Sequence, residues 1–528
     1  MIKVAIIGSG HTGIAVAKVL VQRGARPVIL DVGETLDPER QAVVERMSTQ
    51  RKWEWSAEDL AVVTYNPTVS KDKVLRLAFG SDYPYAGSRV NAPLDVVEDG
   101  PSPSMARGGY STIWGASMLP AASCDIQAWP FRASDLAPYY QSVLQDLPYS
   151  ALDDQLTREF PLYRRDPEPI APSPIVENFL RTLDRSRLLR ERDDVTFGQA
   201  RIAVRATDTP DAPGCVYCGR CLSGCVYGSI YSADQDLEKM VRAGQVEYRS
   251  GRTVLEFSER EGEVDILCET SDGLENVVVN RLFVAAGALN STRLVLESKK
   301  LYGRPTIMKT TQGFVVPMIN VRGAPYEWPN ANTLSGAFFE FKLPSVSNTW
   351  IHAQISPANE LILAKLGYKA TGGLLDGIRK LALGRLLVAL CNFHSDVTGA
   401  YELRLHPAPA GGRSMLSVTL RPSMPFVRTM KKGSRRLTRL LSSVGVFPVA
   451  PLMYGDPLKP VGWHFGGTLP MTKNPSDELH TDLLGRPKGW QRIHVVDSSV
   501  FPSVPATTVA LLAMANASRI AQTAPLES

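Results

Sequence analysis

The sequence has 528 residues, of which 44% are hydrophobic and 21% are charged, so the chain can bury a large core and is expected to contain two or more domains. Its net charge of +5 is small for this length and argues against a nucleic-acid-binding protein. No uncharged apolar run reaches the roughly 18 residues of a spanning helix, so we expect no transmembrane segment. The first predicted strand begins at residue 2, so we also expect no signal peptide.

The N-terminal end of the chain is typical of a dinucleotide-binding βαβ unit. A short apolar strand over Ile2–Ile7 is followed by a helix over Ala15–Val21, and a second strand over Pro27–Leu30 leads into Asp31. The turn between the first strand and the helix carries three glycines in the spacing G-x-G-x-x-G, which are Gly8, Gly10 and Gly13.

The glycine turn predicts how a dinucleotide would bind. The first glycine permits a tight turn, the second lets the backbone approach a pyrophosphate, and the third lets the helix pack closely on the strand. Free N–H groups at the helix N-terminus attract the phosphates. Asp31 lies 18 residues beyond Gly13, where a ribose-binding carboxylate is expected. The spacing does not distinguish NAD from FAD, and a glycine-rich turn without a ligand is the alternative.

The next part of the chain predicts a loop, one close approach to a ligand and two helices. Residues 81–105 are rich in Pro, Ser and Gly and predict a loop. Gly108 and Gly109, followed by small hydroxyl residues, suit a turn whose backbone lies against a ligand. Ser134 is expected to cap the N-terminus of one helix, and a second helix is predicted over Ile175–Leu189.

Four of the seven cysteines lie within eleven residues, in the spacing C-x2-C-x2-C-x3-C, and these are Cys215, Cys218, Cys221 and Cys225. This is the spacing of the bacterial ferredoxin run, except that Val226 stands where Pro usually follows. An iron–sulfur cluster, a structural zinc ion, and thiols that are free or disulfide-linked all remain open. A metal or cluster site indicates a reducing compartment such as the cytoplasm. The other three cysteines are expected to be buried apolar residues: Cys124, Cys268 and Cys391.

The region after the cysteines predicts a return to the dinucleotide domain and then a second sheet. The apolar strand Leu282–Ala286 is followed at once by Gly287 and a helix over Ser291–Leu296, which suits the same domain as the N-terminal unit. Residues 305–460 contain alternating short strands and predict a mixed or antiparallel sheet. The predicted fold class is therefore α/β, or α+β for the chain as a whole.

Two further helices are predicted in the region of the second sheet, over Leu374–Cys391 and Val427–Ser443. Both carry several Lys and Arg residues. A basic amphipathic helix can lie on a membrane surface, whereas the simpler interpretation places the charges in solvent and the apolar side chains in the core.

Five segments, in the right order, resemble the glucose–methanol–choline (GMC) oxidoreductases, which are FAD enzymes. They are GSGHTG with Asp31, then GGYSTIWG at 108–115, AWPFRASDLAPYYQSV, LFVAAGALNSTRLVLES, and the C-terminal pair HFGGT and VVDSSVFPSVPATT. GGYSTIWG is similar to the pyranose-oxidase-like and sugar-dehydrogenase branch, and the cysteine loop is similar to that of long-chain alcohol oxidases. The resemblance implies a Rossmann-like FAD-binding domain and a substrate domain with a mixed or antiparallel sheet, both discontinuous in sequence.

The resemblance also implies the domain bounds and the residues that contact FAD. The FAD-binding domain would comprise residues 1–125, 201–300 and 461–528, and the substrate domain residues 126–200 and 301–460. Besides the three fingerprint glycines and Asp31, the implied FAD contacts are His11, Thr12, Gly108, Gly109, Ser111, Trp114, Val254, Ala286, Gly287, Asp497, Ser498 and Thr507. Some relatives attach FAD to a His in the first signature, but this chain has Ile113 there, so we expect noncovalent FAD.

The resemblance assigns His464 as the base that takes the proton of the substrate hydroxyl, because the family places a His of the HFGGT-like segment beside the flavin. An imidazole suits this work near neutral pH. A second residue of the family, usually Asn or His, commonly precedes a Pro in the C-terminal loop. Anchoring on Pro505 puts Val504 at that position, which can neither accept nor donate a proton. Thr508 and Thr507 are the nearest hydroxyls, and we take Thr508 as the second catalytic candidate.

The predicted activity is that of an FAD-dependent dehydrogenase that oxidises an alcohol or sugar hydroxyl to a carbonyl, with electrons leaving through an iron–sulfur cluster of the [4Fe–4S] or [3Fe–4S] type. The substrate is expected to be a small molecule, with a lipid-linked sugar as one option, and the acceptor a redox-partner protein or a quinone. Two alternatives stay open. One is an oxygen-using oxidase with a structural zinc or an empty cysteine loop, and the other is a redox-inactive flavoprotein of the lyase type. The expected location is the cytoplasm or the inner face of the membrane.

Overall fold

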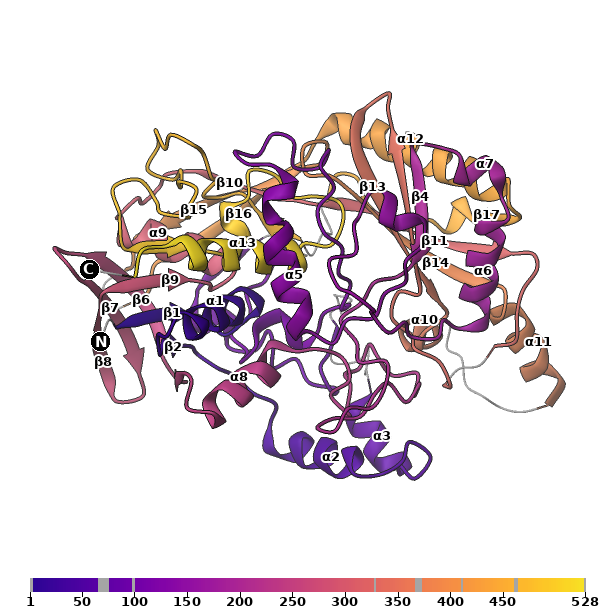
Figure 1. Cartoon of the computed structure of the whole chain (residues 1–528), viewed down its shortest axis with the longest axis horizontal. Helices are drawn as coiled ribbons and strands as arrows, with labels where there is room; N and C mark the ends of the chain where they lie inside the picture. Colours follow the sequence, from indigo (N-terminus) through magenta and orange to yellow (C-terminus); the bar gives the residue numbers. More distant parts are fainter. Residues whose placement is uncertain are drawn as a thin grey trace.

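A five-stranded parallel sheet forms one end of the molecule (Figure 1). The computed structural model describes residues 3–64, 76–96, 100–326, 329–365, 373–409, 412–459 and 464–526. All four strand pairs of this sheet are parallel, and its order is β19-β9-β1-β2-β5. The strands are β1 (Val4–Ile7), β2 (Val28–Leu30), β5 (Glu247–Arg249), β9 (Arg281–Val284) and β19 (Ile493–Val495). This confirms the predicted α/β class and brings segments from both ends and the middle of the chain into one sheet.

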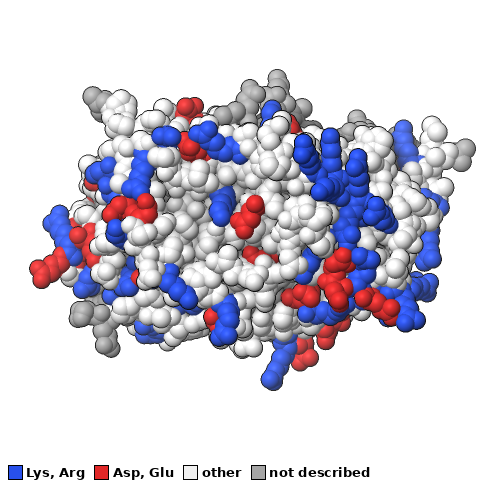
Figure 2. Space-filling view, turned by 90° about the horizontal axis from the view of Figure 1, so that it is seen from above, with Lys and Arg blue, Asp and Glu red and all other residues white. Residues whose placement is uncertain are grey.

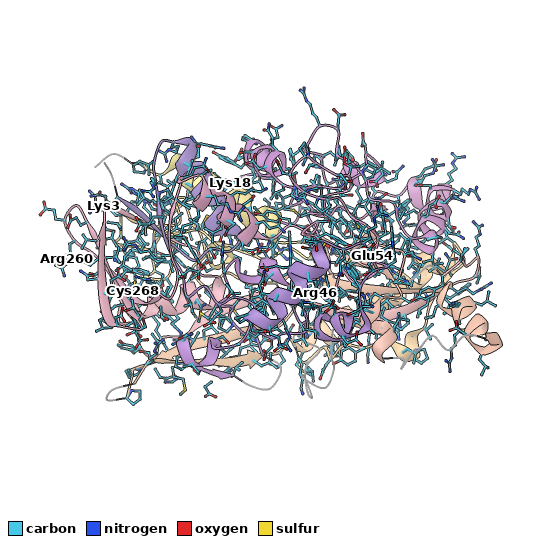
Figure 3. The ribbon with its side chains drawn as sticks, turned by 90° about the horizontal axis from the view of Figure 1, so that it is seen from below. Lys3, Lys18, Arg46, Glu54, Arg260 and Cys268 are labelled. Carbon is cyan, nitrogen blue, oxygen red and sulfur yellow. The ribbon has the colours of Figure 1, made fainter. Side chains whose placement is uncertain are left out.

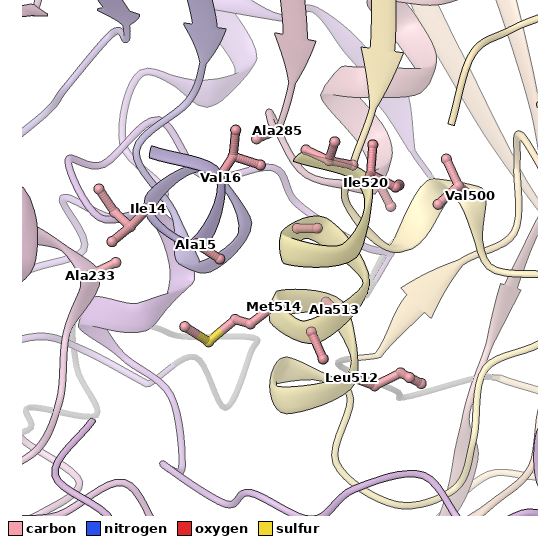
Figure 4. Close-up of a cluster of buried hydrophobic side chains, with 14 of the residues drawn as sticks. Ile14, Ala15, Val16, Ala233, Ala285, Val500, Leu512, Ala513, Met514 and Ile520 are labelled. Carbon is pink, nitrogen blue, oxygen red and sulfur yellow. The ribbon is translucent and has the colours of Figure 1, made fainter. Parts of the chain in front are cut away.

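Helices cover this parallel sheet, and the closest pair is α1 (His11–Gln22) and α13 (Ala510–Thr523). Their apolar side chains form one buried cluster with Ala285, which follows β9 (Figure 4). Three further helices border this part of the molecule, namely α5 (Ala137–Asp146), α8 (Ala233–Arg242) and α9 (Ala288–Ser298). An antiparallel meander of β6 (Thr253–Glu259), β7 (Val264–Thr270) and β8 (Gly273–Val279) extends beside α9.

A six-stranded antiparallel sheet dominates the opposite end of the molecule (Figure 1). Its order is β17-β11-β14-β13-β12-β4, and its strands are β4 (Val195–Gln199), β11 (Gln312–Asn320), β12 (Ala337–Leu343), β13 (Ser347–Pro357), β14 (Leu386–Phe393) and β17 (Val446–Pro448). One face packs against α6 (Pro174–Asp184), α7 (Arg187–Arg190) and α12 (Met424–Ser442) in a second hydrophobic core. Successive residues of each strand alternate between the two faces of the sheet. Residues on the other face, such as Phe338 and Trp350, belong to the core of the parallel sheet, so that face is directed toward the centre of the molecule.

A second five-stranded sheet lies between these ends, in the order β18-β10-β15-β16-β3. Its strands are β3 (Leu94–Val96), β10 (Thr306–Thr310), β15 (Ala400–His406), β16 (Met415–Arg421) and β18 (Phe465–Gly466). Side chains from β10, β15 and β16 belong to the same core as the parallel sheet. The remaining α-helices are α2 (Pro38–Ser48), α3 (Ala57–Val63), α4 (Ser88–Asn91), α10 (Glu360–Lys365) and α11 (Gly373–Leu383), and the 3-10 turns are Gly109–Thr112, Ala133–Leu136, Gln155–Arg158, Ala450–Leu452 and Ser498–Val500.

Three predictions of local structure were wrong. The helix predicted over Leu374–Cys391 ends at Leu383, and Leu386–Phe393 is the central strand β14, because tertiary pairing with β11 and β13 outweighs the helical preference of a Leu-rich run. The loop predicted over 81–105 contains α4 and β3. Ser134 lies inside a 3-10 turn instead of capping a helix, since α5 begins only at Ala137.

The basic helix α12 has one apolar face and one charged face. In α12, the apolar side chains Phe426, Met430 and Leu437 are buried, while five basic side chains are exposed: Arg428, Lys431, Lys432, Arg435 and Arg439. Figure 2 shows a group of basic side chains on the face that carries α12. In the described part of the chain, none of the helices is long and apolar enough to cross a membrane. The predicted domain bounds stay a prediction.

Candidate active site

The glycine turn after β1 has the tight geometry that its spacing predicts. Gly8 has a φ of +94°, and its N–H donates to the carbonyl oxygen of Leu30 at 2.9 Å. A Cβ added at Gly13 would lie 2.0 Å from the carbonyl oxygen of Gly8, and one at Gly8 would lie 2.7 Å from that of Ala285. Glycine is therefore required at both positions, and α1 packs directly on the ends of β1 and β9.

Ser9 links three predicted FAD-binding segments. Its N–H and hydroxyl donate to the Asp31 carboxylate at the end of β2, and its hydroxyl oxygen accepts from the N–H of Gly108 at 2.8 Å. Burial raises the pKa of Asp31 to about 6, although hydrogen bonds from Ser9 and the backbone of Gly33 oppose this shift. Ser9 was not predicted from the sequence, where it is one of the variable positions between the fingerprint glycines.

The N-terminus of α1 is open for an anion. Its N-cap is Gly10, and no side chain caps the first turn, so the backbone N–H groups are available for a pyrophosphate. Gly10 also lies against the second glycine turn, because a Cβ there would be 3.9 Å from the carbonyl oxygen of Gly108. Thr12 is buried in this first turn. The predicted phosphate-binding backbone is thus brought together with the 108–109 turn.

His11 and Trp114 form one wall of this region. Their ring centroids are 4.3 Å apart with an edge-on arrangement, and the Trp114 indole N–H donates to the carbonyl oxygen of Tyr231 at 2.8 Å. Burial lowers the pKa of His11 to about 4, and its Nε2 has no hydrogen-bond partner among the residues that the structure describes. Ser111 is occupied locally, since its hydroxyl donates to the carbonyl oxygen of Gly108 and accepts from Ala233.

Asp497 connects the turn after β9 to the C-terminal segment. Its carboxylate accepts from the N–H of Gly287 at 2.9 Å, from the Ser291 hydroxyl at 2.5 Å and from the N–H of Ser499 at 3.0 Å. Ala286, between β9 and Gly287, donates its N–H to Ser291 at 3.2 Å. Burial raises the pKa of Asp497, and the hydrogen bonds from Ser291 and Ser499 oppose this. Of the predicted contacts, Val254 lies apart from this network, half-buried near the start of β6.

His464 is placed beside the C-terminal segment by its neighbours in the chain. The Ser498 hydroxyl donates to the carbonyl oxygen of Phe465 at 2.6 Å, and the carbonyl oxygen of His464 accepts from the N–H of Thr311 at 3.2 Å. Burial lowers the pKa of His464 to about 4, and the charge of His352 lowers it further. Its Nδ1 is buried with no hydrogen-bond partner among the described residues. The preceding positions 460–463 lie outside those residues.

The loop of Val504, Thr507 and Thr508 closes this side of the site. Val504 is fully buried and exchanges backbone and hydroxyl hydrogen bonds with Ser395. The Thr508 hydroxyl oxygen accepts from the N–H of Leu119 at 2.7 Å, which ties it to the protein. The Thr507 hydroxyl is buried and has no partner within the described part of the chain. Thr507 therefore has the freer hydroxyl of the two.

A buried ionisable pair on the six-stranded sheet was not predicted from the sequence. His352 Nδ1 lies 2.5 Å from the carboxylate of Glu340, and neither side chain has any exposed surface. Both residues alternate with core residues of their strands, so they face the centre of the molecule. The alternation of FFEFK and WIHAQI along two strands is the signal that could have shown these two polar positions on one face.

The cysteine loop packs under the hairpin of α2 and α3. Tyr227 stacks on Trp55 at 5.6 Å between ring centroids, and Lys52 donates to the carbonyl oxygen of Tyr217 at 3.0 Å. The hairpin itself is held by Arg46 of α2, which is labelled in Figure 3 and whose guanidinium donates to the Asp59 carboxylate of α3. The loop is thereby shielded on one side.

Three of the four clustered thiols accept hydrogen bonds. The N–H of Thr333 donates to Cys221 Sγ at 3.4 Å and that of Ser229 to Cys225 Sγ at 3.3 Å, and the Asn332 amide lies 3.6 Å from Cys215 Sγ. Burial raises the pKa values of Cys215, Cys218 and Cys221, and the neighbouring thiols raise them further. However, no three His, Cys, Asp or Glu side chains among the described residues are grouped so that they could hold a metal ion. The prediction of a metal site therefore rests on the spacing of the four cysteines in the sequence.

The residues around the glycine turns fit FAD. The N-terminus of α1 has no side-chain cap, a Cβ at Gly10 would lie 3.9 Å from its nearest neighbour, and His11 Nε2 and the Thr507 hydroxyl are buried without hydrogen-bond partners among the described residues. Two sets of hydrogen bonds hold these residues. One runs from Asp31 through Ser9 to Gly108, and the other runs from Gly287 through Asp497 to Ser499, next to Ser498, which donates to the carbonyl oxygen of Phe465. The site reaches from the predicted ribose-binding end to His464.

Comparison with known proteins agrees with this arrangement. Residues 417–517 match the family model described as GMC oxidoreductase, C-terminal. The fold is similar to the crystal structure of pyridoxine 4-oxidase from Mesorbium loti, with a TM-score of 0.58 and 17% sequence identity over 99% of each chain. No curated protein matches the sequence significantly. The C-terminal segment of the chain therefore matches the GMC oxidoreductase family, and the fold of the whole chain is similar to that of a solved oxidase.

Proposed function

We propose that the chain is a dehydrogenase that oxidises an alcohol or sugar hydroxyl to a carbonyl, with His464 as the base. The observation that carries this proposal is the hydrogen bond from the Ser498 hydroxyl to the carbonyl oxygen of Phe465. It fixes the segment of His464 beside Ser498, which is one of the predicted FAD contacts. Bound FAD would accept the hydride, which is chemistry that the cofactor supplies.

The residues of the chain supply the proton chemistry and the position of the substrate. His464 is neutral at neutral pH because burial lowers its pKa to about 4, so its imidazole is free to accept the hydroxyl proton. Thr507 and Thr508 lie on the same loop, and the Thr507 hydroxyl, which has no partner among the residues that the structure describes, is the one available to bind the substrate or the cofactor. Val504 is a buried apolar residue at the position where the resemblance implies an Asn or His.

The physiological electron acceptor depends on the cysteine loop. The ferredoxin-type spacing and the N–H groups directed at Cys221 and Cys225 support an iron–sulfur cluster, since such hydrogen bonds tune cluster sulfurs. A cluster favours a redox-partner protein or a quinone as acceptor. The second candidate is an oxygen-using oxidase, which the absence of a grouped metal-ligand set among the described residues favours.

Metal analysis combined with anaerobic flavin reduction tests this proposal. The protein is purified without oxygen, its iron, sulfide and zinc contents are measured, and the bound flavin is mixed with pyridoxine, benzyl alcohol, D-glucose and 1-octanol. Flavin bleaching with iron and sulfide supports the dehydrogenase, and bleaching without iron, followed by rapid reoxidation in air, supports the oxidase. A flavin that no alcohol or sugar reduces would contradict both and favour the redox-inactive class.

A further inference from the structure

The face of the six-stranded sheet that looks toward the centre of the molecule carries an unexplained polar pair. Glu340 on β12 and His352 on β13 are register partners, and His352 is in turn paired with Asn392 on β14. The residues on either side of the pair along these strands, Phe339 and Ile351 among them, belong to the core on the opposite face. Glu340 and His352 therefore point away from that core.

This pair lies on the side of the sheet where His464 is found. Asn392 is paired with Gly313 of β11, and the N–H of Thr311, just before that strand, donates to the carbonyl oxygen of His464. The charge of His352 acts on the pKa of His464, so the two imidazoles are within electrostatic reach of one another. Phe338 packs edge-on against His352 with 4.9 Å between ring centroids and covers one side of it.

The two ring nitrogens of His352 differ in their partners among the described residues. Nδ1 lies 2.5 Å from Glu340, whereas Nε2 is buried and, among the described residues, has no hydrogen-bond partner. Glu340 Oε2 is likewise buried and has no hydrogen-bond partner among the described residues. Buried polar atoms in native proteins nearly always have partners, so an imidazole fixed at one nitrogen and left without a partner at the other points to a ligand.

The protonation of the pair decides what Nε2 can do. Burial raises the pKa of Glu340, because an unbalanced negative charge in the interior is unfavourable, and His352 opposes that shift. A pair without net charge is either an imidazolium beside a carboxylate or a neutral imidazole beside a protonated carboxyl. In both forms, Nδ1 shares its proton with Glu340 and Nε2 carries a hydrogen. His352 therefore presents an N–H donor.

We propose that His352, oriented by Glu340, is the second polar residue of the active site and donates its Nε2–H to the substrate oxygen while His464 takes the hydroxyl proton. This assignment rests on the function proposed above. In that step His464 would take the hydroxyl proton as the O–H bond breaks, bound FAD would accept the hydride from the C–H bond, and the C=O bond would form. His352 keeps its proton and stabilises the negative charge that develops on the oxygen. His352 would thereby supply the polar group that Val504 lacks.

The first test compares two substitutions at one position in the FAD-loaded enzyme. His352→Leu removes the donor, and His352→Gln keeps an N–H donor of similar reach. Anaerobic stopped-flow with the alcohol that best reduces the wild-type flavin gives the limiting reduction rate and the substrate dissociation constant separately. We expect His352→Leu to lower the limiting rate about 100-fold or more, as for loss of an oxyanion donor, and His352→Gln to recover at least a tenth of the wild-type rate. His406→Gln, at an exposed His on the end of β15, should leave both constants unchanged.

A second measurement does not depend on turnover, and its main result comes from the wild-type protein. In wild-type holoenzyme labelled with ¹⁵N-histidine, NMR should show one imidazole with a protonated Nε2 and a strongly downfield proton shared at Nδ1, and Glu340→Gln should remove the downfield signal. An unprotonated Nε2 on that ring would overturn the assignment. So would a His352→Leu enzyme that binds FAD and reduces it at the wild-type rate. If no alcohol reduces the wild-type flavin, the proposed function fails first, and this inference fails with it.

Discussion

The backbone N–H of Gly287 donates to the Asp497 carboxylate at 2.9 Å, across 210 positions of sequence. Gly287 ends the turn after β9, and Asp497 follows β19, the neighbouring parallel strand. The bond therefore holds two adjacent carboxyl ends of the sheet in register, where ligands of such sheets bind. Ser499 donates to the same carboxylate, so the loop that leads to Thr507 begins from a fixed point.

Gly13→Ala tests the close contact between α1 and β1. Because the added Cβ would lie 2.0 Å from the Gly8 carbonyl oxygen, we expect the free energy of unfolding to fall by about 3 kcal/mol and FAD retention to fall with it. The matched control is Gly377→Ala in helix α11, where no atom lies within 4 Å of the new Cβ, and it should be neutral or stabilising by up to about 1 kcal/mol. Denaturant unfolding with flavin absorbance measures both, and equal effects at the two glycines would contradict the packing described.

Asp31→Asn tests the burial of the predicted ribose-binding carboxylate. Its folded-state pKa of about 6 lies above the ordinary value of 3.8, so the folded state holds this proton more tightly than the unfolded state. The stabilising contribution of the Asp31 carboxyl to the free energy of unfolding is fully present below pH 4. It is lost, by about 3 kcal/mol in total, as the pH rises through about 6. Unfolding of wild-type and Asp31→Asn apoprotein between pH 4 and 7 should show this difference in slope. Parallel pH profiles would show that Asp31 titrates normally.

Cys221→Ser tests the cysteine loop. Cys221 is buried and its Sγ accepts from the N–H of Thr333, so it is the thiol most firmly placed for a cluster. In anaerobically purified protein we expect its replacement to remove most of the iron and sulfide while the flavin stays bound. Cys268→Ala, a buried cysteine of β7 that lies outside the loop, should keep the wild-type metal content. Iron that survives in Cys221→Ser would exclude this residue as a ligand.

Local patterns predicted the N-terminal strand, glycine turn and helix well, because glycine spacing and buried strands are short-range features. Gly13 shows this, since its lack of a Cβ is needed for a contact five residues away. Partners distant in sequence were not predictable. β14 had the apolar composition of a helix and became a strand only because β11 and β13 pair with it. The Glu340–His352 pair likewise depends on strand register, which no local pattern specifies.

The central claim is that His464 takes the hydroxyl proton, and single-turnover reduction of FAD under anaerobic conditions tests it most directly. His464→Ala should bind FAD but reduce it about 10²–10⁴ times more slowly than the wild type, the range for loss of a general base. In the wild type, the rate should not change between pH 6 and 8 through His464 and should decrease only as the pH falls toward its pKa of about 4. A His464→Ala enzyme that reduces FAD at the wild-type rate would contradict the account.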